Sequence, residues 1–105
     1  MNVTPYPETI TVKVDSEIQS IVPEFIENRK KDCLLIGSLL EGDSFSEIRI
    51  LGHRMKGAGG SYGFDDITVI GEAIENAALA GDKTTISSAI AQLSHYLERI
   101  VVEYV

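Results

Sequence analysis

The chain has 105 residues, the size of a single domain, with 44 % hydrophobic and 24 % charged residues, as is usual for a globular protein. Its net charge of −7 argues against non-specific binding of nucleic acid, which requires a basic face. No apolar run is long enough to span a membrane and no signal peptide opens the chain, so we expect a cytoplasmic protein without membrane contact. Its one cysteine, Cys33, excludes an internal disulfide.

Residues 1–15 differ from the rest of the chain. Thr9–Val14 is rich in alternating β-branched residues, a pattern typical of a strand. Since no second strand is evident to pair with it, we expect residues 1–15 to form an extended arm along the domain, or the end of a linker. Asp15 can cap a short helical turn that leads to Pro23.

Residues 16–105 carry the patterns of four amphipathic helices, with apolar residues recurring at intervals of three and four. We expect the first helix to begin near Pro23 and end at Gly42, and the second to run to about Gly60. Ser44 and Glu47 at its start have the spacing of a capping box. The third helix should occupy about residues 65–80, and the last should follow an Asp cap and extend its apolar seam to residue 104. Because the connections are short, the fold class is all-α: an antiparallel up-down four-helix bundle with a short extended or helical N-terminal arm.

The stretch Leu51–Phe64 is the most unusual part of the sequence. It holds His53, one of the two histidines, together with five of the nine glycines. On a helical wheel its apolar residues lie within about 40° of one line, whereas His53 and Lys56 lie on the opposite side. An imidazole placed there faces solvent beside cations, which favours a reactive histidine over a structural one.

The glycines of this helix require an explanation, because each costs roughly 1 kcal/mol relative to alanine. Gly57 and Gly60 follow His53 by one and two turns, so they remove side chains from the surface beside the imidazole and would let a partner's backbone approach. Gly52 and Gly59 lie on a flank, where we expect them to let a neighbouring helix pack closely. A frayed, glycine-rich helix end is the alternative interpretation.

The motif His53-x-x-Lys56-Gly57, followed by small residues, Gly63 and an aromatic residue, resembles the signature of histidine-containing phosphotransfer (HPt) domains. The resemblance extends over roughly residues 17–101. It includes a segment like the family's first long helix (22–29) and one like the helix after the histidine (70–78). The sequence departs from the pattern at Ala58, where many members carry Ser, and at Phe64, where many carry Ala.

This resemblance implies a carrier and not an enzyme. The histidine of such a domain accepts a phosphoryl group from the aspartyl phosphate of a receiver domain and passes it to another. The implied partners are a response-regulator receiver domain or a hybrid histidine kinase, and the partner supplies the Mg²⁺ and the aspartate. No cofactor and no metal site are therefore expected in this chain.

The residues near His53 suggest how the phosphoryl group would be held. Neutral imidazole is a nucleophile, and neighbouring cations disfavour its protonated form. Lys56 shares the face of His53 and can hold phosphoryl oxygens electrostatically. Arg54 lies about 100° further round the helix and is a weaker candidate for the same role, with simple solvation as the alternative.

Docking of a partner would use the surface around the histidine. We expect Arg49, Ile50, Gly57 and Gly60 to contribute to this patch. For Ile50, a place at the edge of the core is an equally good interpretation.

Two other functions compete with the relay. A metal hydrolase is disfavoured because the positions around His53 hold no metal ligand, and a nucleotide-binding P-loop is absent. A helical interaction module that binds a receiver-like partner without phosphotransfer remains the alternative. His95 has no Lys-Gly pattern after it, and we expect it to be a surface residue.

Overall fold

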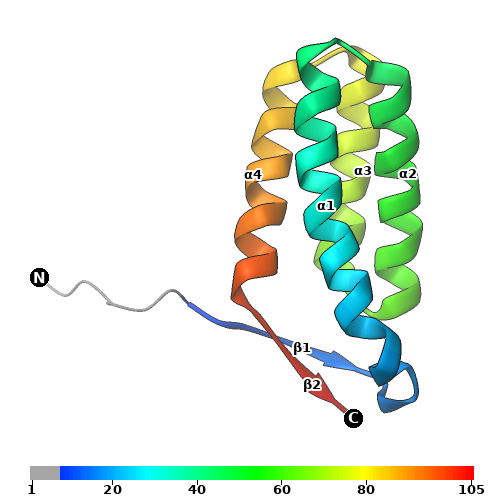
Figure 1. Cartoon of the computed structure of the whole chain (residues 1–105), viewed down its shortest axis with the longest axis vertical. Coiled ribbons are helices and arrows are strands. Elements are labelled where there is room, and N and C mark those ends of the chain that lie inside the picture. Colours follow the sequence, from blue (N-terminus) through cyan, green and yellow to red (C-terminus); the bar gives the residue numbers. More distant parts are fainter. Residues whose placement is uncertain (1–7) are drawn as a thin grey trace, which may run out of the picture.

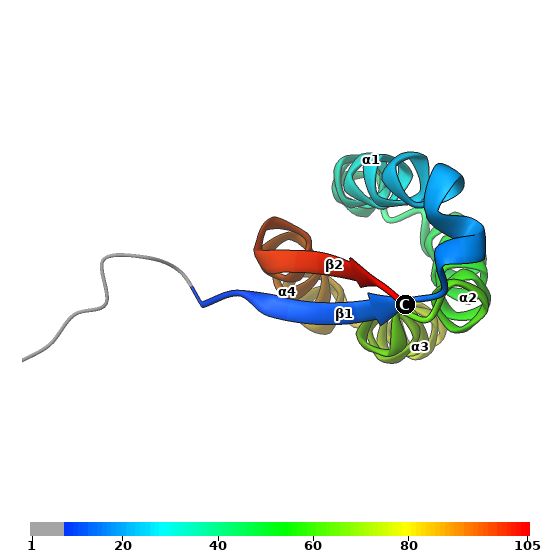
Figure 2. The ribbon, with the colours of Figure 1, turned by 90° about the horizontal axis from the view of Figure 1, so that it is seen from below.

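A computed structural model describes residues 8–105 and contains four helices that stand side by side (Figure 1). In chain order the elements are β1 (Ile10–Val14), a 3₁₀ helix (Ser16–Ile21), α1 (Val22–Glu41), α2 (Phe45–Tyr62), α3 (Asp65–Ala80), α4 (Lys83–Arg99) and β2 (Ile100–Tyr104). Seen from below, the helices follow one another around a ring in the order α1, α2, α3, α4 (Figure 2). The predicted up-down four-helix bundle is confirmed. No helix among the described residues is both long and apolar enough to cross a membrane.

The helix boundaries follow the capping signals of the sequence at most ends. Gly63 and Gly81 end α2 and α3 with φ angles of 84° and 66°, a left-handed conformation that glycine adopts without strain. Asp82 caps α4 by accepting a hydrogen bond of 3.1 Å from the backbone N–H of Thr85. The predicted capping box is wrong, because the Ser44 side chain makes no hydrogen bond with the start of α2.

The two ends of the described chain form a parallel pair of strands, which the sequence analysis did not anticipate. β1 pairs with β2 in a register that sets Ile10 opposite Ile100 and Val14 opposite Tyr104. The expectation that the first strand has no partner is therefore wrong, as is the extension of the last helix to Tyr104, because α4 ends at Arg99. Over five residues, alternate apolar positions fit a strand as well as a helical seam, and β-branched residues favour the strand.

The core lies between the four helices and is closed at the lower end by β1. Val14 is buried there with a relative exposure of 1 %. Phe25 of α1 stacks on Tyr62 with ring centroids 4.3 Å apart, and on Phe64 at 5.3 Å. Phe64 is itself completely buried, so it fixes the α2–α3 turn to the core.

Helices α2 and α3 approach so closely that their backbones touch. A Cβ atom at Gly71 would lie 2.5 Å from the backbone N of Lys56, and one at Gly52 would lie 2.7 Å from the backbone N of Glu75. A Cβ at Gly59 would lie 2.7 Å from the backbone N of Thr68. The prediction that Gly52 and Gly59 permit close helix packing is confirmed, and Gly71 supplies the matching small residue on α3.

Replacing Gly71 by alanine should lower the free energy of unfolding by about 1–3 kcal/mol, because the added methyl meets backbone that cannot rotate away. Gly57→Ala is the matched control. A Cβ there meets nothing within 4 Å, and alanine favours the helix by up to about 1 kcal/mol. Urea unfolding followed by circular dichroism measures both. Equal midpoints for Gly71→Ala and the wild type would contradict the close approach.

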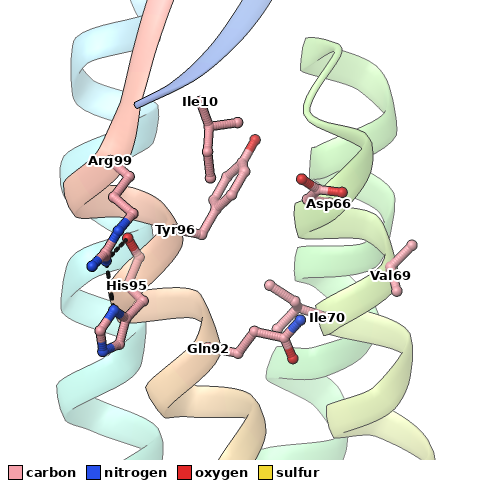
Figure 3. Close-up of a pocket in the computed structure, with 8 residues that line it drawn as sticks. All are labelled: Ile10, Asp66, Val69, Ile70, Gln92, His95, Tyr96 and Arg99. Carbon is pink, nitrogen blue, oxygen red and sulfur yellow. Dashed lines mark hydrogen bonds between the residues drawn. The ribbon is translucent and has the colours of Figure 1, made fainter. Parts of the chain in front are cut away.

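Tyr96 on α4 is buried, and its ring lies near Ile10 of β1 (Figure 3). Burial raises the pKa of the Tyr96 phenol to about 12, and the negative charges of Asp66 and Asp65 add to the effect. The folded protein therefore holds this proton more tightly than the unfolded chain does. The resulting stabilisation is complete below pH 10 or so, the usual range of tyrosine, and is lost as the pH rises through about 12.

Absorbance at the tyrosinate band should thus show one phenol ionising near pH 12 in the folded protein. In Tyr96→Phe this step should be missing, and the alkaline fall in stability should be smaller. Tyr62→Phe, which removes a different phenol, serves as the control. If an ionisation at the same high pH persisted in Tyr96→Phe, the phenol with the raised pKa would not be Tyr96. This result would contradict the burial of this ring.

Candidate functional site

His53 stands on the solvent side of α2, as the helical wheel predicts. Its side chain is 65 % exposed, whereas Ile48 and Met55 of the same helix are buried in the core. The imidazole is therefore available to a partner molecule without any rearrangement of the bundle.

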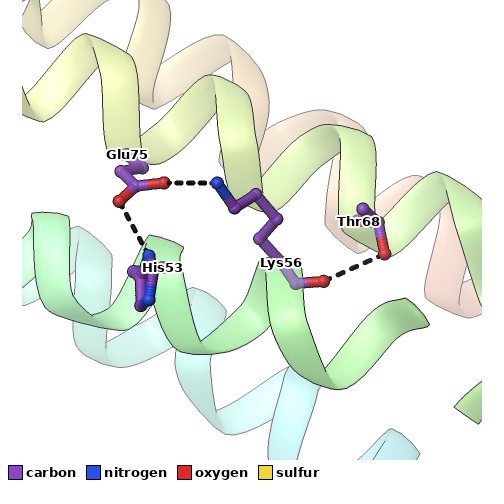
Figure 4. Close-up of polar contacts among 4 residues, drawn as sticks. All are labelled: His53, Lys56, Thr68 and Glu75. Carbon is purple, nitrogen blue, oxygen red and sulfur yellow. Dashed lines mark hydrogen bonds and ion pairs between the residues drawn. The ribbon is translucent and has the colours of Figure 1, made fainter. Parts of the chain in front are cut away.

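A carboxylate from the neighbouring helix binds this ring (Figure 4). Oε2 of Glu75, on α3, lies 2.9 Å from Nδ1 of His53, and Oε1 of the same carboxylate lies 3.2 Å from Nζ of Lys56. The Glu75 side chain is only 14 % exposed, less than either of its partners. Glu75 thus binds both the imidazole and the ammonium from their less exposed side.

The position of Glu75 depends on the close approach of the two helices. The backbone N of Glu75 lies directly against Gly52, the residue before His53. On the other side of the site, Oγ1 of Thr68 donates a hydrogen bond of 3.0 Å to the backbone carbonyl of Lys56. Contacts between the two backbones therefore set the spacing between the carboxylate and both of its partners. The flexible side chains need only small rotations to make these bonds.

The bond to Glu75 determines which nitrogen of His53 is nucleophilic. An ionised carboxylate only accepts hydrogen bonds, so Nδ1 must carry the proton and donate it. In the neutral ring, Nε2 then holds the lone pair. Since Nδ1 is occupied, the exposed part of the ring presents a nitrogen able to attack an electrophile.

The charges at the site are balanced. The hydrogen bond from Lys56 is the main cause that lowers the pKa of Glu75, and the bond from His53 acts in the same direction. Glu75 is consequently ionised at neutral pH. The sequence analysis considered only the cations beside the ring, whereas the structure adds an anion that pairs with Lys56.

The other predicted site residues lie around His53 without joining this network. Arg54 is exposed and makes no ion pair within residues 8–105, and Arg49 is half-buried. Ile50 is 42 % exposed, which favours the surface over the core edge. Gly57 and Gly60 are both exposed, so their stretch of helix presents bare backbone.

Glu75 is the residue that sequence reasoning missed. It follows His53 by 22 residues, and no local spacing connects the two. The available signal was the pair of small residues, Gly52 and Gly71, which mark where α2 and α3 touch. No group of three or more potential metal ligands occurs in the part of the chain that the structure describes.

The second histidine has different surroundings. His95 on α4 is exposed, and its Nδ1 pairs with the guanidinium of Arg99, one turn further on (Figure 3). Because a guanidinium can only donate, this nitrogen of His95 accepts, the reverse of the arrangement at His53. No carboxylate among residues 8–105 holds this ring, and the two histidines are not equivalent.

The comparisons with known proteins identify the family. The family model of the Hpt domain matches residues 20–103, and the chain belongs to this family. Hpt domains carry phosphoryl groups in phosphorelays, with receiver domains as their general partners, and are not catalysts by themselves. Searches of curated proteins and of solved structures return no match.

Removing the Glu75 carboxylate should change the tautomer of His53. In Glu75→Ala, Nδ1 loses its acceptor, so ¹⁵N NMR of the imidazole should show Nε2 becoming partly protonated at a pH where the ring is neutral. Phosphoryl transfer to the domain should slow by about 10- to 100-fold, the size of effect found when a metal-ligating histidine loses the group that orients it. Glu72→Ala, an exposed carboxylate on the same helix, is the control and should change neither. An unchanged tautomer in Glu75→Ala would contradict the assigned bond.

Proposed function

We propose that this domain accepts a phosphoryl group on Nε2 of His53 from the aspartyl phosphate of a receiver domain and passes it to another aspartate. One observation supports the proposal above the others. In a chain of the Hpt family, the imidazole within the family motif is exposed, and its Nδ1 is occupied by Glu75. The nucleophilic nitrogen therefore faces outward.

The transfer step uses the groups of this site as follows. The lone pair of Nε2 attacks phosphorus, a P–N bond forms, and the P–O bond to the aspartyl carboxylate breaks with its electrons leaving on that oxygen. The Nδ1 proton stays between the ring and Glu75, whose negative charge balances the positive charge that develops on the imidazole. The reverse sequence delivers the group to the next carboxylate. A receiver partner would supply Mg²⁺, whose chemistry is to neutralise charge on the transferred group.

Lys56 is suited to hold the phosphoryl oxygens. Its ammonium lies 3.2 Å from Glu75 and has three donor hydrogens, so it can contact the new anion while the carboxylate continues to hold the ring. Arg54 contributes a second positive charge to the same stretch of helix. We propose these two residues as the electrostatic support of the phosphoryl group.

The partner would dock on the surface around His53. Gly57 and Gly60 leave the helix backbone uncovered, which lets a loop of the partner come close to the imidazole. Ile50 supplies exposed apolar area at the edge of this patch, and Arg49 supplies charge. The alternative, an interaction module that binds the same partner without transfer, uses the same surface but has no need for the bond between His53 and Glu75.

Replacing His53 by glutamine should abolish phosphoryl uptake from a ³²P-labelled receiver while leaving binding to that receiver within about two-fold, because glutamine keeps the polarity and approximate size of the ring. His95→Gln, the matched control, should take up label as the wild type does. The label on the wild type should be lost in acid and survive base, as a P–N bond requires. Uptake that persists in His53→Gln would assign the acceptor elsewhere, and binding without any uptake by the wild type would favour the interaction module.

A further inference from the structure

A groove lies between residues of α1 and residues of α4. These two helices lie across the bundle from α2 and α3 (Figure 2). The upper part of the groove has a volume of about 570 Å³ and its lower part about 310 Å³. The two parts share Cys33 and Leu34 of α1 and Ser94 of α4, so they form one continuous surface. The phosphotransfer site does not use this face.

The α1 side of the groove carries a distinctive stripe of four residues. Lys30, Leu34, Gly37 and Glu41 all line the groove and fall within about 60° of one another on the helix. Leu34 is 79 % exposed, the largest value among the exposed large apolar side chains of residues 8–105. Beside it, a Cβ at Gly37 would meet nothing within 4 Å.

Neither central residue of this stripe is explained by contacts within its own chain. A glycine in the middle of a helix costs roughly 1 kcal/mol relative to alanine, and Gly37, unlike Gly52 or Gly71, touches no neighbouring helix. Leu34 projects from the surface one turn before it. In an antiparallel pair of identical helices, the projecting leucine of each copy can fill the vacant space above the glycine of the other.

We propose that this face binds a second copy of the same chain. The two-fold axis would run between the two α1 helices, perpendicular to both, at the level between residues 35 and 36. In an antiparallel pair related by this axis, facing positions have numbers that add to 71. Leu34 of each copy then faces Gly37 of the other, and Lys30 faces Glu41 of the other. A two-fold interface repeats both contacts, as self-complementary surfaces do.

The charges at the two ends of the stripe favour this antiparallel arrangement. Lys30 and Glu41 are opposite in sign and equally far from the axis, so within the α1 stripe the dimer pairs each cation with an anion. Within its own chain, Lys30 has only an exposed contact of 3.5 Å with Glu27, which is weak and easily exchanged. A parallel pairing of the same helices would instead place lysine against lysine.

The dimer leaves the phosphotransfer site free. The α1–α4 face lies across the bundle from α2 and α3, which carry His53 and Glu75 (Figure 2). Both histidines of a dimer are thus open to partners. The inference does not depend on the proposed function, because a domain that cannot transfer phosphate would still associate.

Analytical ultracentrifugation across a range of concentrations tests the proposal on the full chain. The wild type should show a monomer–dimer equilibrium, and Leu34→Glu should be monomeric at concentrations where the wild type is mostly dimer. Gly37→Leu should also be monomeric, because it fills the vacant position, although it improves helix propensity. Leu79→Glu changes an exposed leucine on α3, 68 % exposed, and should leave the dimer intact. Circular dichroism verifies that each variant is folded.

Charge exchange tests the position of the axis. Lys30→Glu should weaken the dimer, and Lys30→Glu combined with Glu41→Lys should restore it at the original net charge. Lys30→Glu with Glu98→Lys, which restores the same net charge on the α4 side of the groove, should not. A wild type that is monomeric at every concentration would overturn the proposed arrangement. So would a dimer that survives Leu34→Glu, or restoration of the Lys30→Glu dimer by Glu98→Lys.

Discussion

The contact between the backbones of α2 and α3 is the constraint on which this structure depends. Two facing glycines, Gly52 and Gly71, let the helices approach to a distance that any side chain would prevent. Each glycine destabilises its own helix by about 1 kcal/mol relative to alanine, but together they fix the spacing between the two helices. That spacing brings Glu75 within hydrogen-bonding distance of His53. The close packing of the two helices therefore determines which nitrogen of His53 carries the proton.

The geometry also separates two requirements that compete in a histidine carrier. The imidazole must be exposed to meet a partner, but an exposed side chain on a long helix turns freely and populates both neutral tautomers. Here the ring stays 65 % exposed while the carboxylate that orients it is only 14 % exposed. The carboxylate orients the ring from the protected side of the helix pair, and the open side leaves the ring accessible to a partner. Both requirements are therefore met.

The sequence predicted the bundle well because its signals are local. Glycines at helix ends, an aspartate cap at Asp82 and apolar residues at helical spacing all act within a few residues. The parallel strand pair and the bond from Glu75 were missed for the opposite reason. β2 follows β1 by some 90 residues in the chain, and Glu75 is 22 residues from His53, so both depend on packing that no local pattern records. The exposed side of His53 was predictable from the helical wheel, whereas its hydrogen-bond partner was not.

The bridge between Lys56 and Glu75 gives the site two distinct electrostatic states. Without phosphate, the carboxylate neutralises the ammonium, and the pair presents little net charge. A phosphoryl group on Nε2 would bring about two negative charges close to the ring and compete with Glu75 for Lys56. Glu75 would keep its bond to Nδ1, because the phosphorylated ring still carries that proton and now needs a counter-charge. The ring would therefore hold its orientation in both states while Lys56 changes partner, and the charge that a receiver meets at this surface would depend on whether the domain is loaded.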